Sequence, residues 1–240
     1  MPLPKISTPT YELDLPSTGK KIKYRPFLVK EEKILIMALE SEDQKQISDA
    51  IKTVISDCIL TRGIKINQLS TFDIEYLFLN VRAKSVGETV EVNITCPDDG
   101  ETQVQMEIDI DSIKVQKDPK HTPIIKLDDE LSIKMKYPSL DQFVEANFET
   151  SEDSSNVDKS LDMITSCIEQ VYNAEESWSA SDCTKKELQG FVEQMNTKQF
   201  KLIEEFFETM PKLSHTINVK NPNTKVDNEV VLEGLASFFS

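Results

Sequence analysis

The sequence predicts an α+β fold in which a helical core carries peripheral antiparallel β-hairpins, with no parallel sheet. Short runs of alternating apolar and polar residues occur in pairs, and a tight turn separates the members of each pair, as in β-hairpins. Helical patterns gather in two regions, residues 30–85 and 139–210. This order differs from the regular alternation of strands and helices that builds a parallel sheet.

Residues 69–100 (LSTFDIEYLFLNVRAKSVGETVEVNITCPDDG) carry the clearest local signals. Ser70 is placed to cap a helix, and Asp73 stands in the acidic position of a capping box. The apolar residues of this helix spread over a wide surface, so we expect the helix to be buried between two layers. Residues 90–95 and 102–108 then alternate as the two strands of a hairpin.

The segment before residue 69 is predicted to contain a hairpin and two helices. Residues 11–15 and 21–25 form short strands around a Pro-Ser-Thr-Gly turn. A helix is expected over 30–40, where the apolar residues lie nearly all round. A second helix, ending at Cys58, has apolar residues at close to ideal helical spacing.

The middle of the chain is predicted to hold a polar, turn-like segment at 110–120 and a hairpin at 124–135. Ser139 and Gln142 form a capping box for a short helix. Residues 149–158 (ETSEDSSNVD) are acidic, serine-rich and free of large apolar groups, as in a linker. We therefore expect three parts: an N-terminal α+β domain at 1–148, this linker, and a helical region at 159–240 that ends in a hairpin and an apolar tail.

Within the C-terminal part, a helix is expected to include Leu161, Ile164, Ile168, Val171 and Tyr172. Residues 174–183 are interpreted as a loop. Two further capped helices follow, the first after Thr184 with Glu187 in a capping box, the second capped by Thr197. A hairpin with strands at 216–219 and 226–232 closes the fold.

The charge is strongly acidic and unevenly placed. The 240 residues have a formal net charge of −15, and residues 141–240 hold 19 acidic against 8 basic side chains. Binding to nucleic acid or anionic lipid depends on Lys and Arg that neutralise phosphate, so this surface disfavours both. The charge favours solubility and leaves basic protein partners open.

The four cysteines lie far apart, without the paired spacing of a metal site or a disulfide framework. Cys58 and Cys167 fall on apolar faces of predicted helices, where a free thiol behaves as a small hydrophobic group. The chain shows neither the pattern of a signal peptide nor an apolar run of transmembrane length. We expect a reduced, cytosolic protein.

Sequence motifs for catalysis are missing. The chain has two histidines, His121 and His215, far apart in sequence, and none of the common nucleophile, phosphate-loop, dinucleotide, zinc-protease or calcium motifs. We predict a protein that is not an enzyme and has no cofactor; an enzyme with a novel site stays an alternative.

Two turns share a layout that resembles the knuckles of a zinc ribbon, in which each turn carries two cysteines that bind one metal ion. The first turn holds Cys96 and Asp99 at the two ligand positions, and the second holds Asn221 and Thr224. One thiolate cannot hold a structural zinc ion, so we predict two metal-free hairpins.

Several longer segments carry a family resemblance: PLPKISTPTYELDLPSTGKKIKYRPFLVKEEKILIMALE, FDIEYLFLNVRAKSVGE, VNITCPDDG, LSIKMKYPS and the terminal EGLASFF. In these the chain resembles the baseplate hub assembly proteins of contractile-tailed bacteriophages of the T-even type. The resemblance spans nearly the whole chain and is densest over residues 1–148. Family members with cysteine-rich turns carry paired cysteines in a terminal hairpin, which this chain lacks.

The resemblance implies a chaperone or minor component that binds baseplate hub proteins during assembly of the central hub, in the cytoplasm of the infected host cell. Two alternatives remain: a permanent structural subunit of the virion baseplate, and a ribbon-like adaptor for nucleic acid, which the acidic charge disfavours.

A chaperone of this kind needs an apolar patch with a polar rim to cover the surface of its partner. The candidate partner-binding residues are large and apolar: Trp178, Phe200, Phe207, Leu235, Phe238 and Phe239. For each, packing within the chain's own core is the alternative, and for the terminal tail we expect docking on the same chain.

Overall fold

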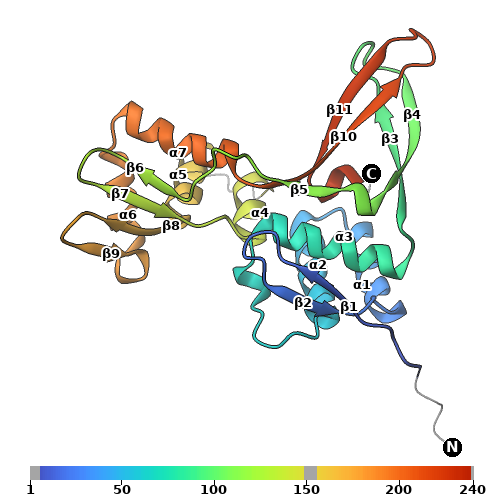
Figure 1. The fold of residues 1–240 in the computed structure, drawn as a ribbon, viewed down its shortest axis with the longest axis horizontal. Helices are drawn as coiled ribbons and strands as arrows, with labels where there is room; N and C mark the ends of the chain where they lie inside the picture. The colour runs from blue at the N-terminus through green and yellow to red at the C-terminus, as the bar shows by residue number, and fades with distance from the viewer. Residues whose placement is uncertain (1–5, 149–155, 239–240) are drawn as a thin grey trace, which may run out of the picture. The chain divides into compact units, whose positions relative to one another are not determined.

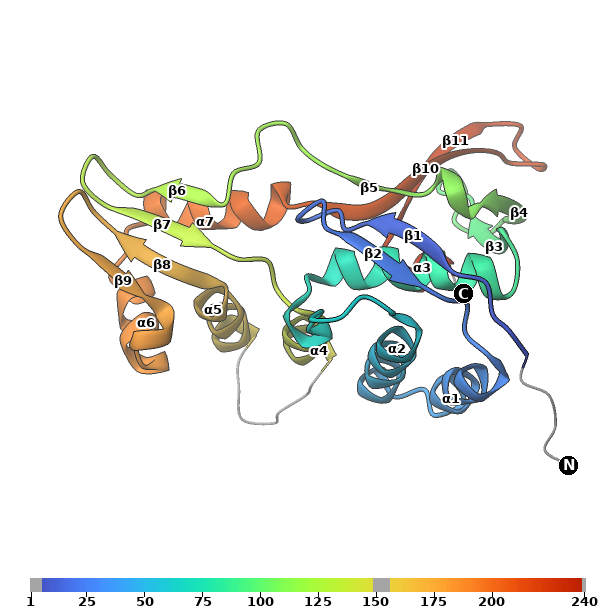
Figure 2. The ribbon, with the colours of Figure 1, turned by 60° about the horizontal axis from the view of Figure 1, so that its bottom comes forward.

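The computed structural model describes residues 6–148 and 156–238, which form seven α-helices, eleven strands and four short 3₁₀ turns (Figures 1 and 2). Every pair of strands in the described residues is antiparallel. The predicted α+β class without a parallel sheet is therefore confirmed for the described part of the chain.

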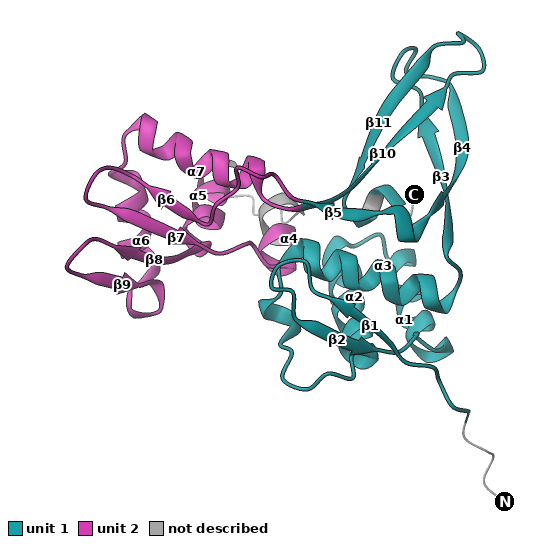
Figure 3. Ribbon diagram, in the orientation of Figure 1, with its two compact units in different colours: residues 1–116, 212–240 teal, residues 117–211 magenta. Residues whose placement is uncertain are grey.

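The chain divides into two compact units (Figure 3). Unit 1 comprises residues 1–116 and 212–240, and unit 2 comprises residues 117–211. These boundaries differ from the expected division at 149–158, most of which lies outside the described residues. The difference arises because the last hairpin pairs with a strand at residues 114–116, which brings the C-terminal segment into the first unit.

Unit 1 contains a hairpin and three helices. Their bounds are β1 Tyr11–Asp14, β2 Lys21–Tyr24, α1 Val29–Glu40, α2 Gln44–Cys58 and α3 Thr71–Ser85. Helix α1 packs on α2 and α2 packs on α3, which places α1 at the edge of this group (Figure 2). Nine of the fifteen residues of α3 are buried, as the wide apolar surface predicted, and the side chain of Ser70 caps it.

The rest of unit 1 consists of long strands. Their bounds are β3 Thr89–Thr95, β4 Gln103–Asp109, β5 Lys114–Gln116, β10 Lys212–Lys220 and β11 Asp227–Glu233. Strands β3 and β4 form one hairpin, and β10 lies between β11 and β5 in a three-stranded sheet. The predicted turn-like segment at 110–120 thus contains a short strand, because Ile113 and Val115 bring apolar groups toward the sheet.

Unit 2 is a four-stranded antiparallel sheet with helices. The bounds are β6 Ile124–Lys126, β7 Ser132–Met135, α4 Leu140–Phe148, α5 Asn156–Ser166, β8 Ile168–Tyr172, β9 Ser177–Ser179, α6 Lys185–Glu193 and α7 Thr197–Thr209. Its core joins buried residues of the sheet to those of α5, α6 and α7: Ile125, Leu127, Ile133, Met135, Ile164, Cys167, Ile168, Val171, Val192, Ile203 and Phe206.

The predicted helix through Tyr172 is wrong beyond Ser166, where α5 gives way to strand β8. Strand β8 carries an irregularity opposite Lys134 and Met135, which leaves Glu169 as an extra residue in the pairing. Because a bulge adds one residue, Ile168 and Val171 are both buried although they are three apart. That spacing is also helical, which explains the wrong prediction.

Two smaller predictions in the same region need correction. The expected loop at 174–183 contains strand β9, which pairs with β8 across a tight turn where the Asn173 side chain accepts hydrogen bonds from the backbone N–H of Glu175 and Glu176. The last helix is capped by Asn196 rather than Thr197, which is the first residue of α7. Asn is among the strongest capping residues, so the shift by one position is physically reasonable.

Candidate functional site

The predicted partner-binding residues of unit 2 differ in their exposure. Trp178 lies in the edge strand β9 opposite Val171, and 41% of its surface is exposed. Phe200 and Phe207, on α7, are half-buried and pack against the core of unit 2. Trp178 is thus accessible to a partner, while the two phenylalanines mainly stabilise α7 on its own sheet.

The C-terminal tail is docked on unit 1. Leu235 and Phe238 lie in a short 3₁₀ turn that contacts β3 and β11, and both are buried, Phe238 completely. The backbone N–H of Leu235 donates a 3.3 Å hydrogen bond to Oε1 of Glu75 on α3. Burial raises the pKa of this carboxyl, and the hydrogen bond from Leu235 lowers it by a smaller amount. The resulting pKa is about 7. Phe239 lies outside the described residues.

Several of the exposed large apolar side chains of unit 1 lie on and just before helix α1. Six large apolar side chains there are between 37% and 79% exposed, and we call them the α1 surface: Leu28, Val29, Ile34, Ile36, Met37 and Leu39. Scattered exposed apolar residues are normal on soluble proteins, but several on one helix are more often part of an interaction site. The exposed Lys30, Lys33 and Glu40 lie among them on α1. Sequence analysis found the all-round apolar character of this helix without assigning it to a partner.

The opposite face of α1 explains why so much of the helix is exposed. Glu31 and Ala38 are buried, and Leu35 packs against a small core that includes Val54 and Cys58 of α2. Leu35 is thus the one large apolar residue on this face, and the charged Glu31 is buried beside it. Helix α1 is therefore attached to unit 1 through its packing on α2 and a polar anchor, and most of its apolar side chains are exposed.

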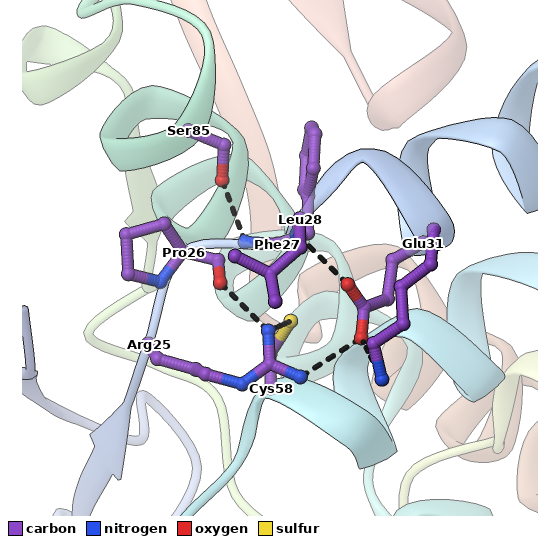
Figure 4. Close-up of polar contacts among 8 residues, drawn as sticks. Arg25, Pro26, Phe27, Leu28, Glu31, Cys58 and Ser85 are labelled. Carbon is purple, nitrogen blue, oxygen red and sulfur yellow. Dashed lines mark hydrogen bonds and ion pairs between the residues drawn. The ribbon is translucent and has the colours of Figure 1, made fainter. Parts of the chain in front are cut away.

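The polar anchor is a buried ion pair at the start of α1 (Figure 4). The Arg25 guanidinium lies 2.8 Å from Oε1 of Glu31, whose side chain has no exposed surface, and donates a second hydrogen bond of 2.9 Å to the carbonyl oxygen of Pro26. The other carboxylate oxygen of Glu31, Oε2, accepts a 2.8 Å hydrogen bond from the backbone N–H of Leu28, and Nζ of Lys30 lies 3.0 Å from Oε1. The carboxylate is thus fully partnered, as a buried charge must be.

The anchor also holds the segment that leads into α1. The backbone N–H of Phe27 donates a 2.9 Å hydrogen bond to Oγ of Ser85 on α3 (Figure 4). Burial by itself would raise the pKa of the Glu31 carboxyl, but the hydrogen bonds from Arg25, Leu28 and Lys30 outweigh it and lower the pKa to about 2. Glu31 is therefore charged at neutral pH, and the start of α1 is fixed to both neighbouring helices of unit 1.

The two turns that resemble zinc-ribbon knuckles meet in space. Figure 1 shows the β3–β4 and β10–β11 hairpins side by side, with their turns at the same end. The side-chain amide of Asn221, which is completely buried, donates hydrogen bonds of 2.9 and 2.8 Å to the carboxylates of Asp98 and Asp99. Thr224 donates to the same Asp98, which also accepts a 2.9 Å hydrogen bond from Asn228.

Hydrogen bonds thus join the two turns at the place where a zinc ribbon would hold its metal ion. The hydrogen bonds from Thr224, Asn221 and Asn228 lower the pKa of Asp98. The hydrogen bonds from Thr102 and Asn221 lower the pKa of Asp99. Burial raises the pKa of the Cys96 thiol, and the negative charges of Asp98 and Asp99 raise it further. Among the described residues, no three His, Cys, Asp or Glu side chains are grouped so that they could bind a metal ion. The absence of a bound metal stays a prediction.

One of the two histidines of the chain, His121, has structural contacts in unit 2. The two ring nitrogens of His121 lie 3.0 Å from the hydroxyls of Thr209 and Tyr137, and its ring packs against Phe206. Both nitrogens therefore have partners, and burial lowers the pKa of the ring. None of the described helices is long and apolar enough to cross a membrane. The feature best suited to act on another molecule is the α1 surface.

Comparison with known proteins agrees with an interaction role. A family model described as T4 bacteriophage base plate protein matches residues 8–240. The chain belongs to this family. The match covers nearly all of the sequence and takes in both compact units, so the chain is a phage baseplate protein over residues 8–240. Searches of curated proteins and of solved structures found no match.

Membership in the family has direct consequences. A baseplate is built from many protein chains, so a baseplate protein contacts other baseplate proteins. The family also indicates a structural or assembly role rather than catalysis.

Proposed function

We propose that this baseplate chain is a non-enzymatic assembly factor for the central hub, which binds baseplate hub proteins through the α1 surface. The observation that carries this proposal is the exposure of six large apolar side chains on a helix that a buried ion pair anchors in unit 1. Burial of such side chains against a partner is favourable by roughly 25 cal/mol per Å² of apolar area. Family membership supports a partner among the baseplate proteins, and the choice of the hub proteins is part of the proposal.

The proposed site of action is the cytoplasm of the infected host cell, before the baseplate is complete. The formal net charge of −15 keeps the free protein soluble while its apolar surface is open, and it disfavours binding to nucleic acid. No cofactor is required for this role. Of the residues proposed from sequence, Trp178 remains a secondary contact candidate, because it is the one that is plainly exposed.

Co-expression of the tagged chain with the hub proteins of the same phage tests the proposal. We expect a stable complex with at least one hub protein, and capture of none would overturn the proposal. Mass spectrometry of purified phage particles then separates the two roles. An assembly factor is absent or present below one copy per baseplate, whereas a whole number of copies identifies a permanent structural subunit instead.

A further inference from the structure

His121 joins the first and last segments of unit 2 through a cluster that we call the His121 clamp: His121, Tyr137, Phe206 and Thr209. The centroid of its ring lies 5.5 Å from that of Tyr137, which follows β7, and 5.1 Å from that of Phe206 on α7. Unit 2 begins at residue 117 and ends at residue 211. His121 is therefore near its start, and Thr209, whose hydroxyl lies 3.0 Å from Nδ1, is near its end.

The hydrogen bond of Thr209 to its own helix determines which ring nitrogen of His121 carries the proton. The Thr209 hydroxyl lies 2.7 Å from the carbonyl oxygen of Glu205, one helical turn earlier. A carbonyl oxygen can only accept, so the hydroxyl donates to Glu205 and offers a lone pair to His121. Nδ1 must then donate, and Nε2 of the neutral ring is an acceptor. The Tyr137 hydroxyl, 3.0 Å from Nε2, donates to it.

A second proton on the ring conflicts with this arrangement. Both nitrogens of a charged imidazolium donate, so Nε2 can no longer accept a hydrogen bond from Tyr137. The ring also lies against Phe206, which is 3% exposed, and burial disfavours the charged form. The contacts from α7 and from the segment after β7 are uncharged. Asp118, in the same loop as His121, favours protonation, but burial has the larger effect and lowers the pKa of the ring.

We propose that the His121 clamp is a pH-sensitive device that holds the end of α7 in unit 2. The neutral ring, with its hydrogen on Nδ1, joins Thr209 to Tyr137. A second proton on Nε2 breaks the hydrogen bond from Tyr137, the charged ring leaves the aromatic cluster, and the end of α7 loosens. The device acts within unit 2 and is independent of partner binding through the α1 surface.

The sign of the pH dependence follows from the burial of the ring. The folded chain binds the second proton less readily than the unfolded chain, in which the pKa has its ordinary value of 6.5. The contribution of the clamp to stability is therefore complete above pH 6.5 and is lost as the pH falls below it.

The nitrogen shifts of the His121 ring test the assigned proton position in the full chain. In protein labelled with ¹⁵N at pH 8, Nδ1 should have the shift of a protonated nitrogen and Nε2 that of an unprotonated one. His215→Gln leaves His121 as the only histidine in the sequence and so assigns the signals. A ring protonated on Nε2 at pH 8 would overturn the proposal.

Removal of either hydroxyl should move the titration midpoint of His121, and in opposite directions. Tyr137→Phe removes a hydrogen bond that only the neutral ring accepts, so the midpoint should rise by roughly 0.5 pH unit or more. Thr209→Val removes an acceptor that the charged ring holds more strongly, so the midpoint should fall. Added apolar surface alone would lower both midpoints, and the opposite tautomer would reverse both shifts; either result contradicts the clamp.

Matched controls separate these shifts from general effects of the substitutions. Thr165 on α5 donates a 2.6 Å hydrogen bond to the carbonyl oxygen of Leu161, the same bond that Thr209 makes one turn back along α7. Tyr172 is a half-buried tyrosine of β8. Thr165→Val and Tyr172→Phe should leave the titration of His121 unchanged, and shifts as large as those of the clamp variants would contradict the assignment.

Hydrogen exchange at the last turn of α7 tests whether protonation loosens it. Below the midpoint of His121, the protection of amides 206–209 should fall at least tenfold relative to the amides of α5. Unchanged protection would show that the ring titrates in place, which would overturn the device. In His121→Gln, whose amide oxygen can accept from Tyr137 but cannot titrate, the fall should disappear. A fall that persists in this variant would show that another group is responsible.

Discussion

The Arg25 guanidinium and the Glu31 carboxylate form a buried ion pair 2.8 Å apart that fixes the start of α1 to unit 1. Arg25 is 14% exposed and Glu31 is completely buried, so the pair is shielded from water. Removing one partner of such a pair leaves an uncompensated charge, which is far more costly than losing an exposed ion pair. The orientation of the α1 surface therefore depends on this contact.

We expect Arg25→Met to lower the free energy of unfolding by roughly 3 kcal/mol, because the Glu31 carboxylate loses its main partner. Lys134→Met removes an exposed ion pair with Glu169 and should cost less than about 1 kcal/mol. Urea denaturation measures both. The double variant Arg25→Met with Glu31→Met should lower the free energy of unfolding by less than Arg25→Met alone, since no unpaired charge remains. Equal losses in Arg25→Met and Lys134→Met would contradict a stabilising anchor.

Glu75 predicts a pH dependence of stability. Its folded pKa of about 7 lies above the ordinary value of 4.5, so the folded protein binds more protons than the unfolded chain between these values. Stability therefore falls as pH rises through this window. Glu75→Gln keeps an acceptor for the N–H of Leu235 and removes the charge.

We expect Glu75→Gln to be more stable than the unchanged chain at pH 8, by about 3 kcal/mol, and nearly equal to it at pH 4.5. Urea denaturation at several pH values provides the comparison. Glu229→Gln, on the exposed side of β11, is the control and should leave the pH profile as it was. A parallel shift of the Glu75→Gln profile at every pH would rule out titration of Glu75 as the cause.

The hydrogen bonds of Asn221 allow a prediction of how much the contact between the two turns contributes to stability. It is completely buried, and its amide bonds to Asp98 and Asp99 while its oxygen accepts from the backbone N–H groups of Asn223 and Thr224. Asn221→Ala should cost roughly 2–4 kcal/mol, because several buried polar groups lose their partner. It should also speed hydrogen exchange at both turns.

Asn223→Ala is the matched control for that experiment. Asn223 lies in the same turn but is exposed, and its side chain donates one hydrogen bond of 2.9 Å, to Thr102. We expect a loss below about 1 kcal/mol. If Asn221→Ala lowered the free energy of unfolding no more than Asn223→Ala, the two turns would be held together by their strands and not by these hydrogen bonds.

The burial of Phe238 allows a prediction of how much the docked tail contributes to the stability of the fold. Its side chain is completely buried, so Phe238→Ala should lower the free energy of unfolding by about 3–5 kcal/mol through lost burial and the cavity left behind. Thermal unfolding of the isolated protein gives the answer, with Val231→Ala at an exposed position as control. An unchanged melting temperature would mean that the tail does not dock on its own chain in solution.

The sequence was sufficient for features that depend on neighbouring residues. The cap at Ser70, the capping boxes at Ser139 and Thr184 and the strand alternation in both long hairpins are all in the structure. These features depend on side chains within a few positions of one another, so local rules are enough to find them.

Features that depend on distant residues were missed. The bulge at Glu169 made a strand look helical, and the pairing of β5 with β10 changed the unit boundaries. The two knuckle-like turns were recognised by their common layout, but their direct contact through Asn221 and Asp98 joins residues more than a hundred positions apart.

The α1 surface was missed for a related reason. A helix that is apolar all round is usually buried, so its pattern alone indicates a core position. Only the structure shows that Glu31 occupies the buried face and that Ile36 points away from unit 1, half exposed. A buried charge in a helix rich in apolar residues is the signal that could have found this surface.

The most direct test of the central claim is the amount of hub protein captured by Ile36→Glu relative to Val231→Glu, each corrected for its melting temperature. Both residues are about half exposed, at 50% and 52%, so neither substitution should destabilise the fold. If α1 binds the hub, Ile36→Glu should lose at least tenfold in capture and Val231→Glu should lose none. Equal capture by the two variants would contradict a role for α1 in binding the baseplate hub.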